Sequence, residues 1–364
     1  MDNKIIFADQ LRGLAILSVI TAHWGGVFWD NRWMVASLTQ SPYFDYPAPA
    51  FVESIKTAIP LFDFGQFGVA IFFLISGFVI PFSLGKKTTK GFIKSRFMRI
   101  FPTYLAASVL SITIVSITSL YYWGIGAHYN WAKVFYNLTL TNSLFDILSF
   151  DAVNWTLSVE IKFYLLCALM TSALTNGRKT ILIAVPLTVL LFTFIFETSQ
   201  SVYKIGGIRI SLFNIKMELM FIGFMFAGVA FNFHFKRLMS TTNLVFISLL
   251  ICFITLITWY IGPIKNQYPS SPASFIYATV LFSICYILKN HFREKRALTF
   301  LSGISYPLYI THSVIGYTIL RITLDSGQNI YSSMAITALL IFIIATTIHH
   351  TIERYSINKG KLYK

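Results

Sequence analysis

Two ionisable residues, Arg12 and His23, interrupt the first apolar stretch of the chain, and their types and spacing could carry chemistry. The stretch covers residues 11–29 and is long enough to span a membrane. Eleven residues make about three helical turns, so the two side chains lie near one face, about 16 Å apart along the axis. A neutral imidazole can take a proton from a hydroxyl near working pH. Because ionisable groups within a membrane are costly, we expect His23 to act as a general base with Arg12 on the same helix.

Other polar residues of the apolar runs can be placed by depth, at about 1.5 Å per residue across a core of about 30 Å. Measured from the cytoplasmic side, His23 lies about 18 Å deep, His312 about 21 Å and Glu160 about 22 Å. Ser76 lies nearer 12 Å. Glu160 is expected either to orient His23 as a carboxylate partner or to pair with Arg12 and join two helices.

The remaining candidates each have a structural alternative. Ser76 and Ser158 could be nucleophiles, although a serine in a helix usually bonds its own backbone. Tyr309 and His312 could line the path of an acceptor or form an ordinary polar seam. Trp155 could be a stacking platform for a sugar or part of the aromatic belt at the membrane surface.

Composition indicates the elements that must position these residues. The chain has 364 residues, of which 55% are hydrophobic and 12% charged, and its mean hydropathy is +0.66. These values exclude an ordinary soluble domain. We predict an all-α integral membrane protein, one bundle of about ten transmembrane helices forming a single domain over 1–364. The expected spans are 11–29, 64–84, 100–123, 155–175, 180–197, 213–233, 243–262, 272–289, 298–321 and 329–351.

Loop charge orients these spans. Lysine and arginine gather in the loop 85–99 and after every second expected span, whereas the segment 30–63 carries several acidic residues. By the positive-inside rule, 85–99 is a cytoplasmic loop, 30–63 an outer loop, and both termini are cytoplasmic. The net charge of +15 then follows from topology and attraction to anionic lipid, so nucleic acid is not expected as a partner.

The basic loop could also bind a substrate. Arg96 and Arg99 lie three residues apart at the start of a span, with Lys94 beside them. Any cytoplasmic loop is basic, but arginine forks bind phosphate bidentately where lysine offers a point charge. Tyr104 could stack on an adenine or anchor the interface.

Several segments resemble the membrane-bound acyltransferase family 3, which decorates bacterial surface glycans with acyl groups. They are DQLRGLA at 9–15 with Ala22-His23, FFLISGF at 72–78, the basic run Lys94–Arg96 with Arg99, Pro102 and Tyr104, WTLSVEIKFY at 155–164, and GISYPLYITH at 303–312. The resemblance covers nearly the whole chain. It departs from the family at Ile161-Lys162, where more polar or acidic residues are frequent.

The resemblance implies an O-acyltransferase, most simply an O-acetyltransferase, of the bacterial inner membrane. It would draw acetyl-CoA or another acyl-CoA from the cytoplasm as a substrate, with no permanently bound cofactor, and acylate a hydroxyl of a surface polysaccharide or its lipid-linked precursor. His23, Glu160 and Arg12 would form the catalytic group, and Arg96, Arg99, Lys94 and Tyr104 would bind the donor.

A second class of function is compatible with the same residues. A proton-coupled exporter or channel for a lipid-linked sugar would also place histidine and glutamate at mid-depth, with basic loops inside. The sequence has no Walker-type loop, no zinc-spaced Cys/His cluster and no HExxH pattern. We therefore expect neither ATP nor a metal to take part. The sequence does not indicate an oligomeric state.

Overall fold

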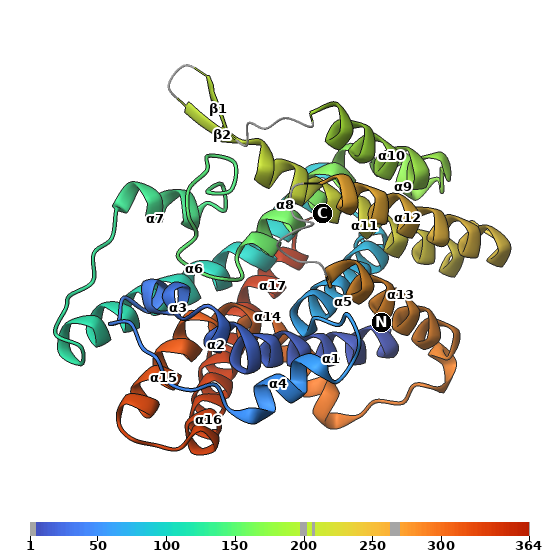
Figure 1. Ribbon diagram of the computed structural model, residues 1–364. Helices are drawn as coiled ribbons and strands as arrows, with labels where there is room; N and C mark the ends of the chain where they lie inside the picture. Colours follow the sequence, from blue (N-terminus) through green and yellow to red (C-terminus); the bar gives the residue numbers. More distant parts are fainter. Residues whose placement is uncertain (1–4, 197–201, 206–207, 263–269, 364) are drawn as a thin grey trace.

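The structure is a computed structural model that describes residues 5–196, 202–205, 208–262 and 270–363. It is a bundle of helices with one short antiparallel hairpin (Figure 1), as the composition predicts. The hairpin pairs β1 (Val202–Ile205) with β2 (Ile208–Ser211).

The first helical segment is continuous but irregular. It consists of α1 (Ile6–Ala22), a π-helical turn (His23–Val27) and α2 (Phe28–Asp30). A π turn inserts one extra residue into a helix and is frequent at functional sites. Here the π turn begins at His23, so the His23 side chain is attached where the helix geometry changes from α to π.

The central helix of the bundle is α5 (Phe64–Val79), which packs against α1, α11 (Leu212–Phe235) and α13 (Ser271–Ile287). Glycines let α5 and α11 approach closely: a Cβ on Gly77 would lie 2.0 Å from the carbonyl oxygen of Met225, and one on Gly228 would lie 2.3 Å from that of Leu74. Small residues at such contacts permit tight packing where no hydrophobic effect drives helices together.

Other long helices surround this centre. They are α6 (Thr89–Tyr121), α8 (Trp155–Leu169), α10 (Thr180–Ile195), α12 (Thr241–Ile261), α14 (Arg296–Thr311), α15 (Val314–Asp325) and α16 (Ile330–Ile348). The shorter elements are α3 (Arg32–Thr39), α4 (Ala50–Thr57), α7 (Trp131–Leu138), α9 (Thr171–Thr175), α17 (Arg354–Lys361), 3-10 turns at Ile80–Phe82 and Lys289–His291, and a π turn at His349–Glu353.

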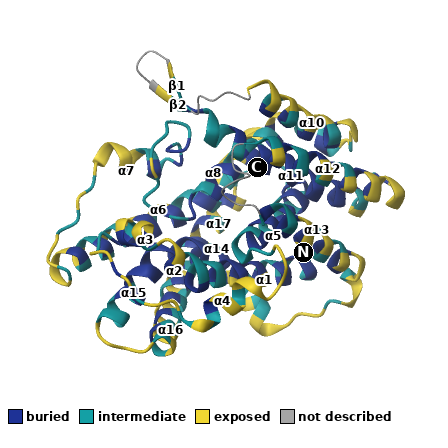
Figure 2. Ribbon diagram, viewed as in Figure 1, coloured by how far each residue is buried: buried dark blue, intermediate teal, exposed yellow. Residues whose placement is uncertain are grey.

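Burial follows the pattern expected of a membrane bundle. Figure 2 shows buried residues gathered along the central helices, with exposed residues on outer faces such as that of α12. Many of those exposed residues are large and apolar, among them Phe246, Leu249 and Phe253 of α12 and Leu339 and Ile343 of α16. Apolar side chains facing outward on apolar helices are suited to a lipid environment.

Six helical segments of the described chain are long and apolar enough to cross a membrane: Ile6–Asp30, Phe64–Phe82, Thr89–Tyr121, Leu212–Phe235, Thr241–Ile261 and Ile330–Lys361. Two apolar helices, α10 and α13, are shorter. The expected span 298–321 is not one helix, because α14 ends at Thr311 and α15 begins at Val314. The total of ten crossings and the side of the termini stay predictions.

Candidate active site

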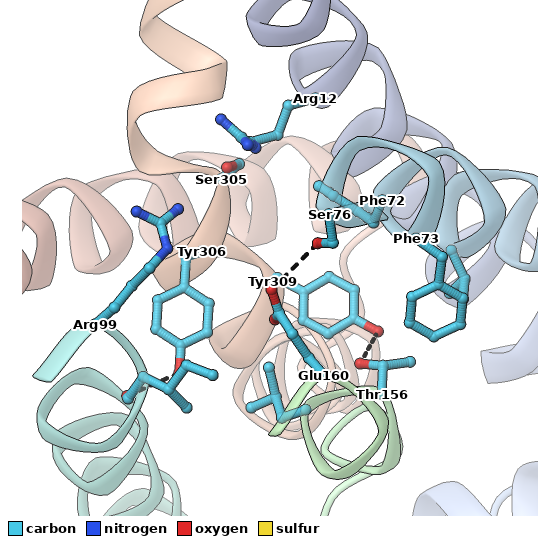
Figure 3. A pocket seen from close by; sticks show the side chains of 13 residues that line it. Arg12, Phe72, Phe73, Ser76, Arg99, Thr156, Glu160, Ser305, Tyr306 and Tyr309 are labelled. Atoms are coloured by element: carbon cyan, nitrogen blue, oxygen red, sulfur yellow. Dashed lines mark hydrogen bonds between the residues drawn. The ribbon is translucent and has the colours of Figure 1, made fainter. Parts of the chain in front are cut away.

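The first of two cavities, which we call the arginine pocket, has a volume of about 90 Å³. Helices α1, α5, α6, α8 and α14 supply its walls, and its lining residues are Arg12, Val69, Phe72, Phe73, Ser76, Arg99, Ile100, Thr156, Leu157, Glu160, Ser305, Tyr306 and Tyr309. Figure 3 shows the side chains of Arg12 and Arg99, from α1 and α6, reaching toward the same space. The sequence motifs around these two arginines and Glu160 therefore meet in one site.

Glu160 lies in this pocket and does not pair as expected. Its Oε1 accepts a hydrogen bond from Ser76 at 3.2 Å and another from the hydroxyl of Tyr164. Arg12 instead makes its ion pair with Asp9, at 3.2 Å. Neither predicted partnership of Glu160, with His23 or with Arg12, is present as a hydrogen bond or ion pair among the described residues. Ser76 reaches Glu160 although the two residues were expected at different depths.

The two arginines of α6 have different surroundings. The Arg99 guanidinium lines the arginine pocket, and among the described residues it makes no hydrogen bond or ion pair. Arg96 donates from Nη2 to Ser83 Oγ at 2.7 Å, and its guanidinium lies 5.3 and 5.5 Å from the ring centroids of Phe92 and Tyr164. Arg99 thus makes no hydrogen bond among the described residues, although Glu160 and Glu353 act on its charge, whereas Arg96 is hydrogen-bonded to Ser83.

Two residues predicted to bind the donor lie elsewhere. Lys94 is exposed, with its ammonium 5.3 Å from the ring centroid of Tyr363. Tyr104 is buried, donates to the carbonyl oxygen of Asn137 at 2.9 Å and accepts from Asn154 at 3.3 Å. The prediction that Tyr104 stacks on an adenine is wrong for this structure, because its ring is packed inside the protein.

The second cavity, which we call the histidine cavity, is much larger, at about 700 Å³. His23 and Trp155 line it, together with polar residues that include Asp30, Asp63 and Gln66. Trp155 also packs against Phe221, with ring centroids 5.1 Å apart.

His23 has two aromatic neighbours. Its Nδ1 lies 2.5 Å from the hydroxyl oxygen of Tyr317, and its ring meets that of His312 edge to face at 4.8 Å. The two histidines, which were expected at similar depths, lie side by side in the structure. His312 is fully buried; its Nδ1 lies 3.2 Å from the carbonyl oxygen of Leu308, and its Nε2 has no partner among the described residues. Because a carbonyl can only accept, Nδ1 of His312 carries the proton.

The two cavities share a wall formed by Val69 and Tyr309. The Tyr309 hydroxyl lies 2.9 Å from Thr156 Oγ1, a contact drawn in Figure 3, and its ring lies 5.8 Å from that of His312. The pair Tyr309 and Thr156 therefore stands between Glu160 on one side and the two histidines on the other.

Ser158 belongs to neither cavity. It is buried and accepts a hydrogen bond from Lys162 Nζ at 2.6 Å, and Lys162 forms an ion pair with the buried Glu218 at 2.7 Å. This network also accounts for the lysine at the position where the chain departs from the family pattern. Ser158 therefore does not line the arginine pocket or the histidine cavity, whereas Ser76 lies in the arginine pocket.

Two features of the site were not predicted from the sequence. Tyr317 lies in an apolar run with nothing in its spacing to link it to His23. Asp151, in the loop before α8 and outside the long apolar helices, is buried, and its Oδ1 accepts from Ser313 at 2.7 Å and from the amide of Val153 at 3.0 Å. Burial raises the pKa of the Asp151 carboxyl to about 6. The described residues contain no group of three or more His, Cys, Asp or Glu side chains placed to hold a metal ion.

Fold and site together define a helical membrane protein with a cationic pocket and a histidine-lined cavity at its centre. The family model described as an acyltransferase domain matches residues 5–349, nearly the whole chain. The chain therefore belongs to acyltransferase family 3 and is a multi-pass membrane protein of that family. No curated protein and no solved structure matches it.

Proposed function

We propose that this acyltransferase moves an acyl group, most simply acetyl, from cytoplasmic acyl-CoA to a hydroxyl of a surface polysaccharide or its lipid-linked precursor. The observation that carries the proposal is the meeting of two unlike cavities at Val69 and Tyr309. One presents unpaired arginine to an anionic donor, and the other presents histidine to a hydroxyl.

On the donor side, the proposal assigns phosphate recognition to Arg99 and Arg12. Arginine binds phosphate in a planar, bidentate manner, and a pocket inside the protein strengthens that interaction. The Arg99 guanidinium makes no hydrogen bond or ion pair among the described residues, although Glu160 and Glu353 act on its charge. Arg96 would instead hold the loop, because Ser83 already occupies its Nη2.

On the acceptor side, the proposal assigns the sugar to the histidine cavity. Its volume of about 700 Å³ suits one or more sugar units, and Trp155 offers an aromatic face beside hydrogen-bonding groups such as Asp63 and Gln66. His23 lies in the same wall, within reach of a bound hydroxyl.

The proposed reaction is a direct transfer. His23 Nε2 takes the proton of the acceptor hydroxyl as its oxygen attacks the carbonyl carbon of the thioester. A carbon–oxygen bond forms, the carbon–sulfur bond breaks, and the departing thiolate takes the proton from the imidazolium to leave as coenzyme A. The Tyr309 hydroxyl lies at the boundary between the cavities, and by exchanging its hydrogen bond to Thr156 it would donate to the oxyanion that forms during the attack.

The experiment that tests this function uses the purified protein in proteoliposomes. Acetyl-CoA labelled in the acetyl group is supplied on the side of the basic loop, with a surface-glycan extract as acceptor, and label in the glycan is followed by mass spectrometry. We expect label in the glycan and saturable binding of acetyl-CoA. Export of a lipid-linked sugar without binding of acyl-CoA would support the alternative, a proton-coupled exporter or channel, and would contradict the proposal.

A further inference from the structure

We propose that Tyr317 is a positioning residue that holds His23 in one orientation and, by accepting a hydrogen bond from its Nδ1–H, keeps Nε2 unprotonated. The inference rests on the proposed function, in which His23 is the general base, and adds a residue to it. Tyr317, in α15, has its Oη 2.5 Å from His23 Nδ1, so this nitrogen is hydrogen-bonded within the protein. The remaining ring nitrogen, Nε2, is then the one left for the histidine cavity.

Tyr317 is held firmly enough to position another side chain. It is fully buried, and its ring packs near-parallel to the imidazole of His23, with centroids 5.9 Å apart, and against Phe28 at 6.0 Å. Because packing holds the ring, the phenol oxygen stays in one position. A hydrogen-bond partner held in this way keeps a catalytic side chain in one orientation better than a mobile partner does.

The backbone around the pair is fixed as well. Trp24, inside the π turn, donates from Nε1 to the carbonyl oxygen of His312 at 2.9 Å. Gly316 permits this approach, since a Cβ there would lie 2.8 Å from the same indole nitrogen. The π turn and the junction of α14 with α15 are thereby joined next to His23, and the edge of the His312 ring limits rotation of the imidazole.

The chemical consequence concerns the proton on His23. A base must present an unprotonated nitrogen to the hydroxyl that it activates. If Nδ1–H donates to Tyr317 Oη, Nε2 carries the lone pair toward the cavity, and the resulting imidazolium keeps its hydrogen bond. Without the phenol oxygen, both tautomers become available and the ring loses its anchor.

The test is Tyr317→Phe, which keeps the ring and removes only the hydroxyl. We expect kcat to fall by about 10- to 100-fold, a part of the 10²- to 10⁴-fold that a positioned general base contributes. KM for acetyl-CoA and for the acceptor should stay within about twofold, because neither substrate contacts Tyr317 in this account. Thr318→Val is the matched control: it removes a neighbouring, equally buried hydroxyl that donates to the carbonyl oxygen of Val314 in its own helix, and should leave kcat unchanged.

A spectroscopic readout separates positioning from simple packing. The protein labelled with ¹⁵N-histidine should show His23, assigned by its absence in His23→Ala, as one tautomer protonated at Nδ1. Tyr317→Phe should show a mixture of tautomers, and Thr318→Val should match wild type. If Tyr317→Phe aggregates, 3-fluorotyrosine at position 317 keeps the volume but weakens the oxygen as an acceptor, and should lower kcat alone.

The outcomes distinguish this inference from the function on which it rests. Wild-type kcat in Tyr317→Phe, with the His23 tautomer unchanged, would overturn the role of Tyr317 while leaving His23 as the base. Equal losses in kcat and in acetyl-CoA binding would also overturn it, since they indicate general disruption of the site. Absence of any transfer by the wild-type protein would instead count against the proposed function.

Discussion

At the scale of single residues, the clearest contrast lies between two arginines one helical turn apart. Arg99 faces the arginine pocket without a partner among the described residues, whereas Arg96 donates to Ser83 and lies over two aromatic rings. The positive-inside rule treats the two alike, because it counts charge and not geometry. Their different surroundings imply different effects of the same substitution.

Arg99→Lys should therefore weaken donor binding while keeping the charge. Replacing a planar fork by a point charge should lose about 1 to 3 kcal/mol of charge-assisted hydrogen bonding and raise KM for acetyl-CoA about tenfold or more. KM for the acceptor should hardly change. Arg96→Lys should lower the thermal midpoint without changing the donor KM. Lys86→Arg, in the exposed part of the loop, should change neither quantity. Steady-state kinetics in proteoliposomes would refute the assignment if Arg99→Lys kept the wild-type donor KM.

Asp151 provides a prediction for pH. Burial raises its pKa in the folded protein to about 6, from an ordinary value of 3.8, so folding disfavours the ionised form. The neutral Asp151 carboxyl makes its full contribution to the free energy of unfolding below about pH 4. This contribution is lost as the pH rises through 6, a change of up to about 3 kcal/mol.

Asp151→Asn removes this dependence and should gain thermal stability relative to wild type between pH 4.5 and 7.5. Thermal midpoints in detergent across that range measure the difference. The variant also loses hydrogen bonds, which shifts its thermal midpoint by an amount that does not vary with pH. A difference between the two proteins that is flat across the range would show that Asp151 does not titrate there.

The sequence predicted which polar residues gather inside the bundle better than it predicted their partners. Arg12, Arg99 and Glu160 do line one pocket, and His23 does meet His312. Counting depth along straight helices did not indicate the contact between Ser76 and Glu160, because such a count takes no account of tilt or side-chain length. Tyr317 could not be found, since a tyrosine in an apolar run resembles many others.

At the scale of elements, the packing of α5 against α11 determines the position of Ser76 and Phe72 in the arginine pocket. Gly77→Ala or Gly228→Ala would place a methyl group within 2.0 or 2.3 Å of a facing carbonyl oxygen. Because both neighbours are backbone atoms, the helices must separate, and we expect a loss of several kcal/mol, in the range of overpacked cores. Yield of monodisperse protein and its thermal midpoint measure the effect.

Gly303→Ala is the matched control for these two variants. Gly303 lies within α14, and a Cβ there meets nothing within 4 Å. Alanine has the higher helix propensity, so this change should be neutral or stabilising by up to about 1 kcal/mol. Wild-type stability in Gly77→Ala would mean that α5 and α11 do not approach as closely as the structure has them.

The sequence predicts where most long helices lie, but it does not predict where they are interrupted. Apolar runs of spanning length coincide with α5, α6, α11, α12 and α16, because composition alone makes them helical in a membrane. The break between α14 and α15 and the π turn at His23 depend on tertiary contacts, such as the hydrogen bond from Trp24 to the carbonyl of His312. No local signal in the sequence indicates those contacts.

At the scale of the whole molecule, orientation is the prediction on which the side of the donor depends. A cysteine placed at Lys295 should react with an impermeant reagent from the cytoplasmic side, and one placed at Asp45 from the outside. Both positions are exposed, and the native cysteines give little background, since Cys167 and Cys285 are buried and Cys252 is partly buried. Labelling of position 45 from the cytoplasm would reverse the orientation and the proposed entry side of acyl-CoA.

The central claim is that the molecule separates donor and acceptor into two cavities that meet at Val69 and Tyr309, with His23 as the base on the acceptor side. The most direct test measures two quantities on His23→Ala in proteoliposomes: transfer of labelled acetyl to the glycan, and equilibrium binding of acetyl-CoA. We predict transfer below about a tenth of wild type, because a general base contributes at least 10²-fold, with the Kd for acetyl-CoA within about threefold. Transfer above that level with intact binding would show that His23 is structural and would contradict the account.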